Sequence, residues 1–132
     1  MKTKFKKHSL LSLLILILLS AAIALSVTSC DDDTLGEGEK QFIFEAHHAD
    51  GTVNTVTVNT DKSTVGEALI EIEMISGEEG PYGLMVMTVD GETHKYEDDG
   101  KYWAFYINGE YAMSGVDTTE ITDGATYAFK VE

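Results

Sequence analysis

Cysteine and basic residues are scarce in this chain of 132 residues. Cys30 is the only cysteine, so no intrachain disulfide can form. Five lysines follow Cys30, whereas all 23 acidic residues lie at or after Asp31. A surface with this charge repels phosphate backbones and anionic lipid head groups, so we expect neither nucleic-acid binding nor electrostatic docking on a membrane. Such acidity is instead typical of a domain kept soluble outside the cell.

Charge is also absent from the apolar run between Leu10 and Val27, which four lysines precede. This layout predicts a signal peptide, although the run borders on the length of a bilayer-spanning helix, and a retained anchor is the alternative. The small residues Thr28 and Ser29 stand directly before Cys30, which resembles the lipobox cut by lipoprotein signal peptidase. We therefore predict a cleaved signal peptide over 1–29 and a Cys30 carrying diacylglycerol and palmitate. Secretion with a free thiol is a third interpretation.

The mature chain is predicted to have a tether and one domain. Residues 30–40 comprise Cys30 and the sequence DDDTLGEGEK, whose charge, glycine and low apolar content predict a flexible tether. Residues 41–132 hold every aromatic residue except Phe5 and are long enough for one small domain with a single core. We expect the whole to be anchored by lipid to a bacterial membrane, on its extracytoplasmic face at the cell surface.

The first elements of the domain are a predicted hairpin and a helix. Phe42 and Phe44 alternate with polar positions in one strand, Asp50-Gly51 supplies a turn, and a second strand runs from Val53 to Asn59. Thr64 and Glu67 then fit a helix capping box. One helical face follows at the expected spacing, made of Val65, Ala68, Leu69, Ile72 and Ile75.

Several strands are predicted after the helix. Leu84 to Val89 is apolar on both alternating faces, as expected of a central strand. Asn108-Gly109 is the strongest hairpin signal in the chain, and it separates Tyr102–Ile107 from Glu110–Met113. A last strand contains Tyr127, Phe129 and Val131. The order β-β-α followed by several strands predicts an α+β domain of the β-grasp type, with one helix packed on a mixed sheet.

Signals for metal binding and catalysis are weak. His47 and His48 are adjacent in a predicted strand, so their side chains point to opposite faces and are interpreted as exposed rather than metal-ligating. The run Glu97-Asp98-Asp99-Gly100 is interpreted as an acidic turn. Ser114 lacks the context of a catalytic serine. We expect no metal site and no enzymatic activity.

Three linked segments resemble a known family. The helix segment Ser63–Leu69, the step Tyr82-Gly83-Leu84 and the strand and turn Tyr102–Gly109 are similar to the transcobalamin-like C-terminal domain, over about 90 residues. Bacterial members of that group include many lipoproteins of unknown function. In its animal members the domain closes over cobalamin that a larger helical barrel holds. The resemblance therefore implies a β-grasp domain that binds a small soluble ligand, with a corrinoid such as cobalamin as the best-known class.

The resemblance also implies where a ligand would lie. Two stretches match the places at which the animal members touch cobalamin, the turn Gly80–Leu84 and the segment Tyr102–Gly109. The implied ligand-binding residues are Tyr82, Gly83, Leu84, Tyr102, Trp103, Phe105, Tyr106 and Asn108. Tyrosine and tryptophan can lie flat on an apolar macrocycle while offering a hydroxyl or an N–H. This chain has no helical barrel, which leaves weak binding, a partner chain or a different ligand as open alternatives.

The same aromatic residues also fit a purely structural role. Alternation along the strand places Trp103, Phe105 and Ile107 on one face, as in an ordinary core. It places Tyr102 and Tyr106 on the opposite face.

The sequence therefore favours a lipid-anchored binding module that captures a small ligand and hands it to a transporter. A structural or adhesion module that contacts an envelope protein or glycan is the main alternative. An accessory subunit that completes another protein's site is a third.

Overall fold

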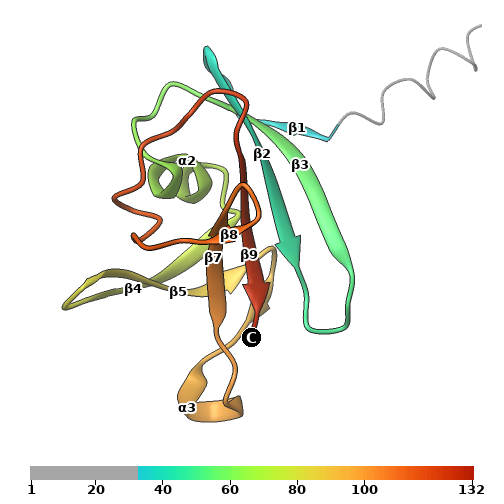
Figure 1. Ribbon diagram of the computed structural model, residues 1–132, viewed down its shortest axis with the longest axis vertical. Helices are drawn as coiled ribbons and strands as arrows, with labels where there is room; N and C mark the ends of the chain where they lie inside the picture. Colours follow the sequence, from blue (N-terminus) through green and yellow to red (C-terminus); the bar gives the residue numbers. More distant parts are fainter. Residues whose placement is uncertain (1–32) are drawn as a thin grey trace, which may run out of the picture. The chain divides into compact units, whose positions relative to one another are not determined.

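A six-stranded mixed sheet is the larger of two sheets in residues 33–132, the part of the chain that the computed structural model describes. Its strands lie in the order β1 (Thr34–Leu35), β3 (Val53–Thr60), β2 (Lys40–His47), β9 (Thr126–Val131), β7 (Trp103–Ile107) and β8 (Glu110–Tyr111). The first hairpin, β2 and β3, is antiparallel as predicted, and the last strand β9 inserts parallel to β2. β7 then pairs antiparallel with β9 (Figure 1). The predicted α+β class is confirmed.

The N-terminal cap that the sequence predicts for the helix is present. In α2 (Val65–Glu71) the Thr64 hydroxyl accepts a hydrogen bond from the Glu67 backbone N–H at 3.2 Å, which satisfies one of the free donors of the first turn. The helix is shorter than its apolar spacing predicts. It ends at Glu71, Glu73 adopts a positive φ of 59°, and Ile75 begins a strand. The expectation that Ile75 belongs to the helix face is wrong, because the chain reverses and buries this β-branched residue opposite Val89 instead.

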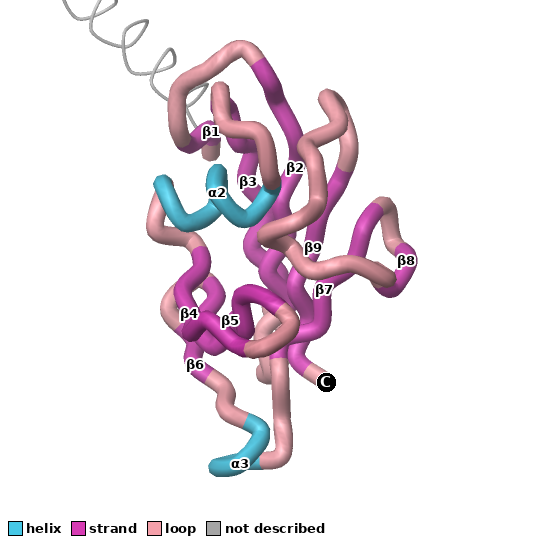
Figure 2. The backbone as a smooth tube through the Cα atoms, turned by 90° about the vertical axis from the view of Figure 1, so that its left-hand side faces the viewer, coloured by secondary structure: helices cyan, strands magenta, loops and turns pink. Residues whose placement is uncertain are grey.

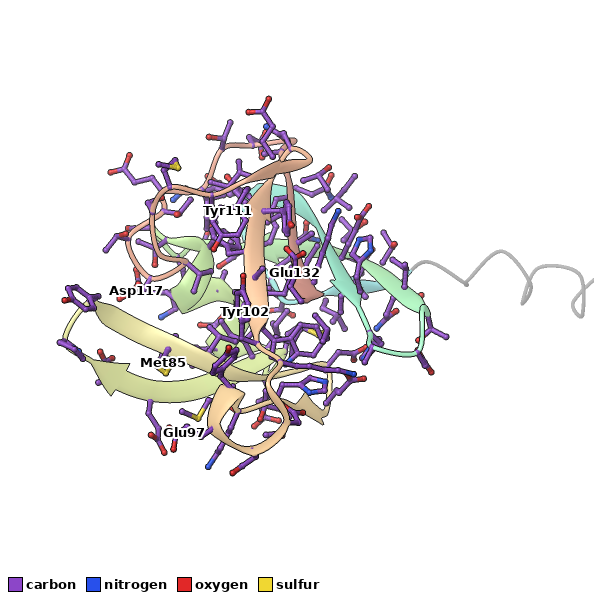
Figure 3. The ribbon with its side chains drawn as sticks, turned by 60° about the horizontal axis from the view of Figure 1, so that its bottom comes forward. Met85, Glu97, Tyr102, Tyr111, Asp117 and Glu132 are labelled. Carbon is purple, nitrogen blue, oxygen red and sulfur yellow. The ribbon has the colours of Figure 1, made fainter. Side chains whose placement is uncertain are left out.

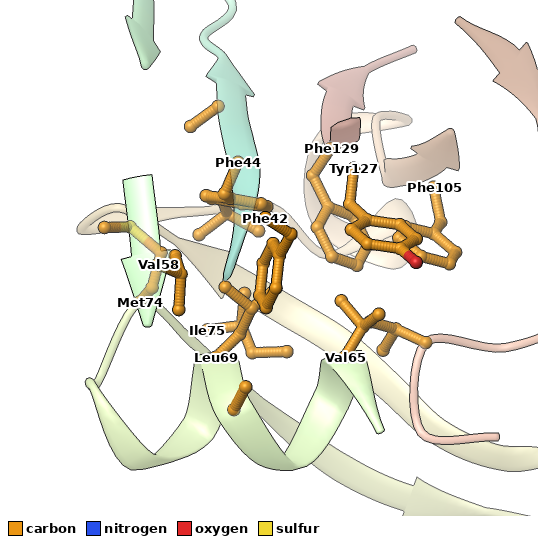
Figure 4. Packing of buried hydrophobic residues seen from close by; sticks show 14 of the residues in the cluster. Phe42, Phe44, Val58, Val65, Leu69, Met74, Ile75, Phe105, Tyr127 and Phe129 are labelled. Atoms are coloured by element: carbon orange, nitrogen blue, oxygen red, sulfur yellow. The ribbon is translucent and has the colours of Figure 1, made fainter. Parts of the chain in front are cut away.

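The main core lies between α2 and the large sheet. Phe42 and Phe44 of β2 are fully buried, and their rings meet Tyr127 and Phe129 of β9 edge-on, with centroids 5.2 and 6.3 Å apart. Leu69 closes the core from the helix (Figure 4). Each such side chain contributes about 1.5 to 3 kcal/mol through removal of apolar surface from water.

A second sheet stands apart from the first. Its strands lie in the order β4 (Ile75–Gly80), β5 (Gly83–Val89) and β6 (Glu92–Thr93). Figure 2 shows this small sheet and α2 on the same side of the large sheet, with the four-residue helix α3 (Tyr96–Asp99) beyond it. The strand predicted from Leu84 to Val89 is central here and not in the large sheet, and only Val89 of it is buried. Its apolar residues are not covered on both faces, because no helix of the described part packs on the outer side.

The predicted tether is partly folded. Thr34 and Leu35 form β1 and pair parallel with Thr57 and Val58 of β3, and the Thr57 N–H donates to the Asp33 carbonyl at 2.9 Å. Thr34 and Leu35 of the predicted tether are thus held in the large sheet, and Lys40 already begins β2. Leu35 is the physical reason, since it packs against the core as the one apolar side chain of that acidic stretch.

The predictions for the N-terminus fall on residues outside the described part. These are the signal peptide over 1–29 and the lipidation of Cys30. Among residues 33–132 no helix is long and apolar enough to cross a membrane.

Candidate functional site: an aromatic groove

An apolar groove of about 540 Å³ lies between β5, α3 and β7. β5 contributes Leu84, Met85 and Val86, and the other lining residues come from α3, β7, β8, the loop after β8 and β9. The remaining lining residues are Tyr96, Tyr102, Trp103, Ala104, Phe105, Tyr111, Ala112, Ser114, Gly115, Val116 and Phe129. None of these side chains is acidic or basic. The groove is thus suited to an apolar surface with a few polar contacts.

Large side chains along the groove remain open to solvent. Tyr96 is 69% exposed, Tyr102 is 42% exposed and Tyr111 is 56% exposed, while Met85 of β5 is 57% exposed. Figure 3 shows Met85 on the β4–β5 hairpin and Tyr102 and Tyr111 beside β7. A concentration of exposed aromatic and methionine side chains on a small domain marks a contact surface.

The floor of the groove belongs to the core. Trp103 and Phe105 are 5% and 8% exposed, and both line the groove while packing in the core cluster. The Trp103 indole N–H donates to the Glu92 carbonyl at 3.1 Å, which fixes the ring. The core and ligand interpretations of these two residues therefore do not exclude each other, since both residues pack in the core cluster and line the groove.

The structure brings together four of the residues that the resemblance implies. Leu84, Tyr102, Trp103 and Phe105 all line the groove. Tyr82 does not, because it lies at the turn of the β4–β5 hairpin and is 99% exposed.

Gly83 shapes the hairpin rather than the groove lining. Its φ is 107°, a conformation that favours glycine, and a Cβ there would stand 2.8 Å from a carboxylate oxygen of Asp117. The backbone N–H of Leu84 donates to that same Asp117 carboxylate at 3.1 Å. Asp117 therefore ties the hairpin to the loop that follows β8 (Figure 3).

Tyr106 and Asn108 lie outside the groove lining and have structural contacts. The Tyr106 hydroxyl donates to the Glu132 carboxylate, which raises the pKa of Tyr106 to about 12, and Lys130 Nζ lies 4.4 Å from the centre of its ring. Asn108 has a φ of 48°, and its side-chain oxygen accepts from the Thr126 N–H at 2.9 Å. Asn108 thus stabilises the hairpin turn that the sequence predicts there.

Beside the groove, two histidines and three carboxylates form one hydrogen-bonded chain. His48 Nε2 bonds to Asp90 at 2.9 Å and its Nδ1 to Glu92 at 2.8 Å. His94 Nε2 bonds to the other oxygen of Glu92, and its Nδ1 to Asp99 at 2.7 Å. Both imidazoles face the Trp103 ring edge-on. These hydrogen bonds connect the end of β2, the β5–β6 turn and α3.

These contacts favour the charged form of every group that they shift. The hydrogen bond to Asp90, helped by Glu92, raises the pKa of His48 against the effect of burial, and Asp99 followed by Glu92 raises the pKa of His94. Burial opposes the change at Glu92, but the hydrogen bonds from His94 and His48 lower its pKa. The interpretation of His48 as an exposed strand residue is wrong, since its side chain is only 14% exposed. Within residues 33–132 no three His, Cys, Asp or Glu side chains are arranged to hold one metal ion.

Comparison with known proteins places the chain in a family. Residues 62–132 match the model of a family described as a domain of unknown function, DUF4430. The chain belongs to this family. No curated protein matches it.

Two solved structures are similar to this DUF4430 chain. A protein from Ruminococcus gnavus, provisionally described as metal-binding, is 31% identical with a TM-score of 0.68, over 71% of this chain and 97% of that protein. Haptocorrin in complex with Cbi is 15% identical with a TM-score of 0.52, over 74% of this chain and 26% of haptocorrin. The chain thus spans about a quarter of haptocorrin, a member of the transcobalamin family, and shares its fold in that part. The resemblance to the transcobalamin-like C-terminal domain is confirmed.

Sequence reasoning missed most residues of this groove, among them three large exposed side chains and the residue that anchors its hairpin wall. Met85, Tyr96 and Tyr111 line the groove and Asp117 anchors its hairpin wall. A signal existed for Tyr111, because the Asn-Gly turn sets a register that places Tyr111 opposite Tyr106 at the sheet edge. No local pattern marks Asp117, which meets a backbone N–H 33 positions earlier in the chain.

Proposed function

We propose that this protein is a binding module that captures a small soluble ligand in the groove between β5, α3 and β7. The observation that supports this most is the convergence of Leu84, Tyr102, Trp103 and Phe105 on one uncharged groove. These residues come from the two stretches that match the places where animal members of the transcobalamin-like family touch cobalamin. The proposal is one of binding without catalysis.

A corrinoid is the ligand class that we propose to test first. The order β3-β2-β9-β7, with the first and last of these strands in sequence, β2 and β9, parallel at the centre, supports a β-grasp arrangement like that of the transcobalamin-type domain. The related haptocorrin was solved with Cbi bound. Only one face of a macrocycle would be covered by a single domain, so we expect a Kd no better than about 1 μM.

The ligand test uses Trp103, the only tryptophan, as a reporter. Cobalamin absorbs in the range of indole emission, so saturable quenching corrected for inner-filter absorption is the expected result. Tyr102→Ala should weaken binding about tenfold or more, because Tyr102 lines the groove. Tyr82→Ala is the matched control, since Tyr82 projects away from the groove lining. Equal loss in both variants would move the site to the hairpin turn, and absence of saturation confirmed by calorimetry would remove corrinoid capture.

We also propose that the module is anchored by lipid outside the cytoplasm. The support is the small-residue segment before Cys30 and the placement of every acidic residue after it. Labelled palmitate should enter the wild-type chain and not the Cys30→Ser variant, and the variant should leave the membrane fraction. Incorporation that persists in Cys30→Ser would contradict this part of the proposal.

Adhesion is the second candidate function. Tyr82 and Met113 are 99% and 97% exposed at the ends of two loops, where an envelope partner has free access to them. Under this function Tyr82→Ala and Met113→Ala would reduce attachment of cells to their surface partner, while Tyr102→Ala would not.

A further inference from the structure

Three tyrosines from separate segments share the groove. Tyr96 belongs to α3, Tyr102 directly precedes β7 and Tyr111 belongs to β8. Tyr102 and Tyr111 lie close enough to affect each other, because the Tyr111 hydroxyl is the main cause of the raised pKa of Tyr102. Glu132 and Tyr96 add smaller contributions of the same sign. All three side chains line the same groove.

Within residues 33–132, no lysine belongs to the lining of the groove that these rings share. The cation–π contact of residues 33–132 is the one between Lys130 and Tyr106. The surrounding domain is strongly acidic, since all acidic residues except Asp31 and Asp32 fall within 33–132, against five lysines. Such a net charge attracts cations to the domain as a whole and repels anions.

Exposed tyrosine rings in an uncharged groove bind weakly hydrated cations best. The face of a tyrosine ring carries negative potential and attracts a cation, most strongly when the cation sheds little hydration. Methylated ammonium groups fulfil this condition, and their methyl groups also suit an apolar floor such as Trp103 and Phe105. An anionic ligand would meet no compensating charge in the lining.

We infer that the groove selects ligands that present an alkylated ammonium group, or a similarly soft cationic surface, to Tyr96, Tyr102 and Tyr111. The inference rests on the proposed function and deepens it by naming the charge class of the ligand. Removal of the positive charge at constant shape should therefore cost affinity, whereas addition of apolar surface without charge should not replace it.

A pair of isosteric probes tests this inference. Choline and 3,3-dimethylbutan-1-ol differ in the replacement of N⁺ by carbon. Their affinities for the full chain, kept soluble in an uncharged maltoside detergent, are measured by Trp103 fluorescence and by calorimetry. We expect choline to bind about tenfold more tightly. Equal affinity, or tighter binding of the alcohol, would overturn the inference.

Variants assign the preference to the rings. Tyr102→Phe should keep most of the preference for choline and Tyr102→Leu should remove most of it. Tyr82→Leu, at the exposed hairpin turn outside the groove lining, should leave it unchanged. Tyr111→Leu provides a second test if Tyr102→Leu lowers the melting temperature. An unchanged preference in both groove variants would overturn the inference.

Binding of cobalamin, measured in the same way, distinguishes failure of this inference from failure of the proposed function. Saturable cobalamin binding without any binding of choline would overturn the cation preference and leave ligand capture in place. Failure of all three probes would remove both the cation preference and corrinoid capture.

Discussion

Two regions of this domain, the core side and the groove side, treat apolar residues in opposite ways. In the core between α2 and the large sheet, Phe42, Phe44, Tyr127 and Phe129 are at most 2% exposed. Along the groove, Met85, Tyr96, Tyr102 and Tyr111 are 42% to 69% exposed. The first set contributes stability because its surface is removed from water. The second set leaves apolar surface exposed to water, and a bound molecule could bury that surface with a gain in free energy. This supports the assignment of the second set as a binding surface.

The largest expected effect is at the core side. Phe129→Ala removes a ring that packs on Phe44 and Phe105 at centroid distances of 6.3 and 5.1 Å. We expect a loss of about 3 to 5 kcal/mol in the free energy of unfolding, because a buried cavity replaces the ring. Urea unfolding measures the loss, and Tyr102→Ala as the groove-side counterpart should cost less than half as much. Equal losses would remove the distinction between the two sides.

The next effect concerns the link between the two sides. Asp117→Ala removes the carboxylate that accepts from the Leu84 N–H and leaves the β4–β5 hairpin without this tie. We expect a loss of about 1 to 3 kcal/mol, as for hydrogen bonds to charged groups, together with weaker ligand binding. Asp117→Asn keeps an acceptor oxygen and should recover part of both. Binding that is unchanged in Asp117→Ala would show that the hairpin position does not matter to the groove.

A smaller effect is the dependence of stability on pH through His48 and His94. Their pKa values are raised in the folded state, so their contribution is complete below the ordinary value of 6.5 and is lost as the pH rises through the folded values. The pKa of Glu92 is lowered, so its contribution is present above 4.5 and is lost as the pH falls through its folded value. The melting temperature should therefore be highest between about pH 4.5 and 6.5.

The general acidity of the domain also favours low pH, so a variant is needed. His94→Gln removes one titrating group from the hydrogen-bonded series of His48, Glu92 and His94. It should flatten the fall in melting temperature above pH 6.5. An identical pH profile for wild type and variant would assign the effect to overall charge.

The smallest effect is expected at Tyr82. Its side chain is 99% exposed, so Tyr82→Ala should change the free energy of unfolding by less than about 0.5 kcal/mol. Thermal melts check this value. A larger loss would mean that the hairpin turn is held by contacts of the tyrosine ring.

Local patterns predicted most elements, whereas the four groove residues that were predicted, Leu84, Tyr102, Trp103 and Phe105, came from the family resemblance. The Thr64 cap, the Asn108-Gly109 turn and the alternating strand Trp103–Ile107 depend on neighbours within a few residues, and all three are present. Patterns failed where a distant partner decides the outcome. Ile75 continues the helical spacing but pairs with Val89, and Leu35 follows three aspartates but docks on β3.

The sequence by itself determined the fold class, the capped helix, the hairpins and the aromatic residues of β7, because periodicity and turn chemistry act over short stretches. Only the tertiary structure decided that Leu84, Tyr102 and Trp103 meet Met85, Tyr96 and Tyr111 in one groove while Tyr82, Tyr106 and Asn108 stay outside its lining. It also decided that Asp117 holds the groove's wall and that His48 and His94 share Glu92. The physical reason is that these contacts join segments up to 44 positions apart, so their geometry depends on how two sheets and a helix pack and not on any local repeat.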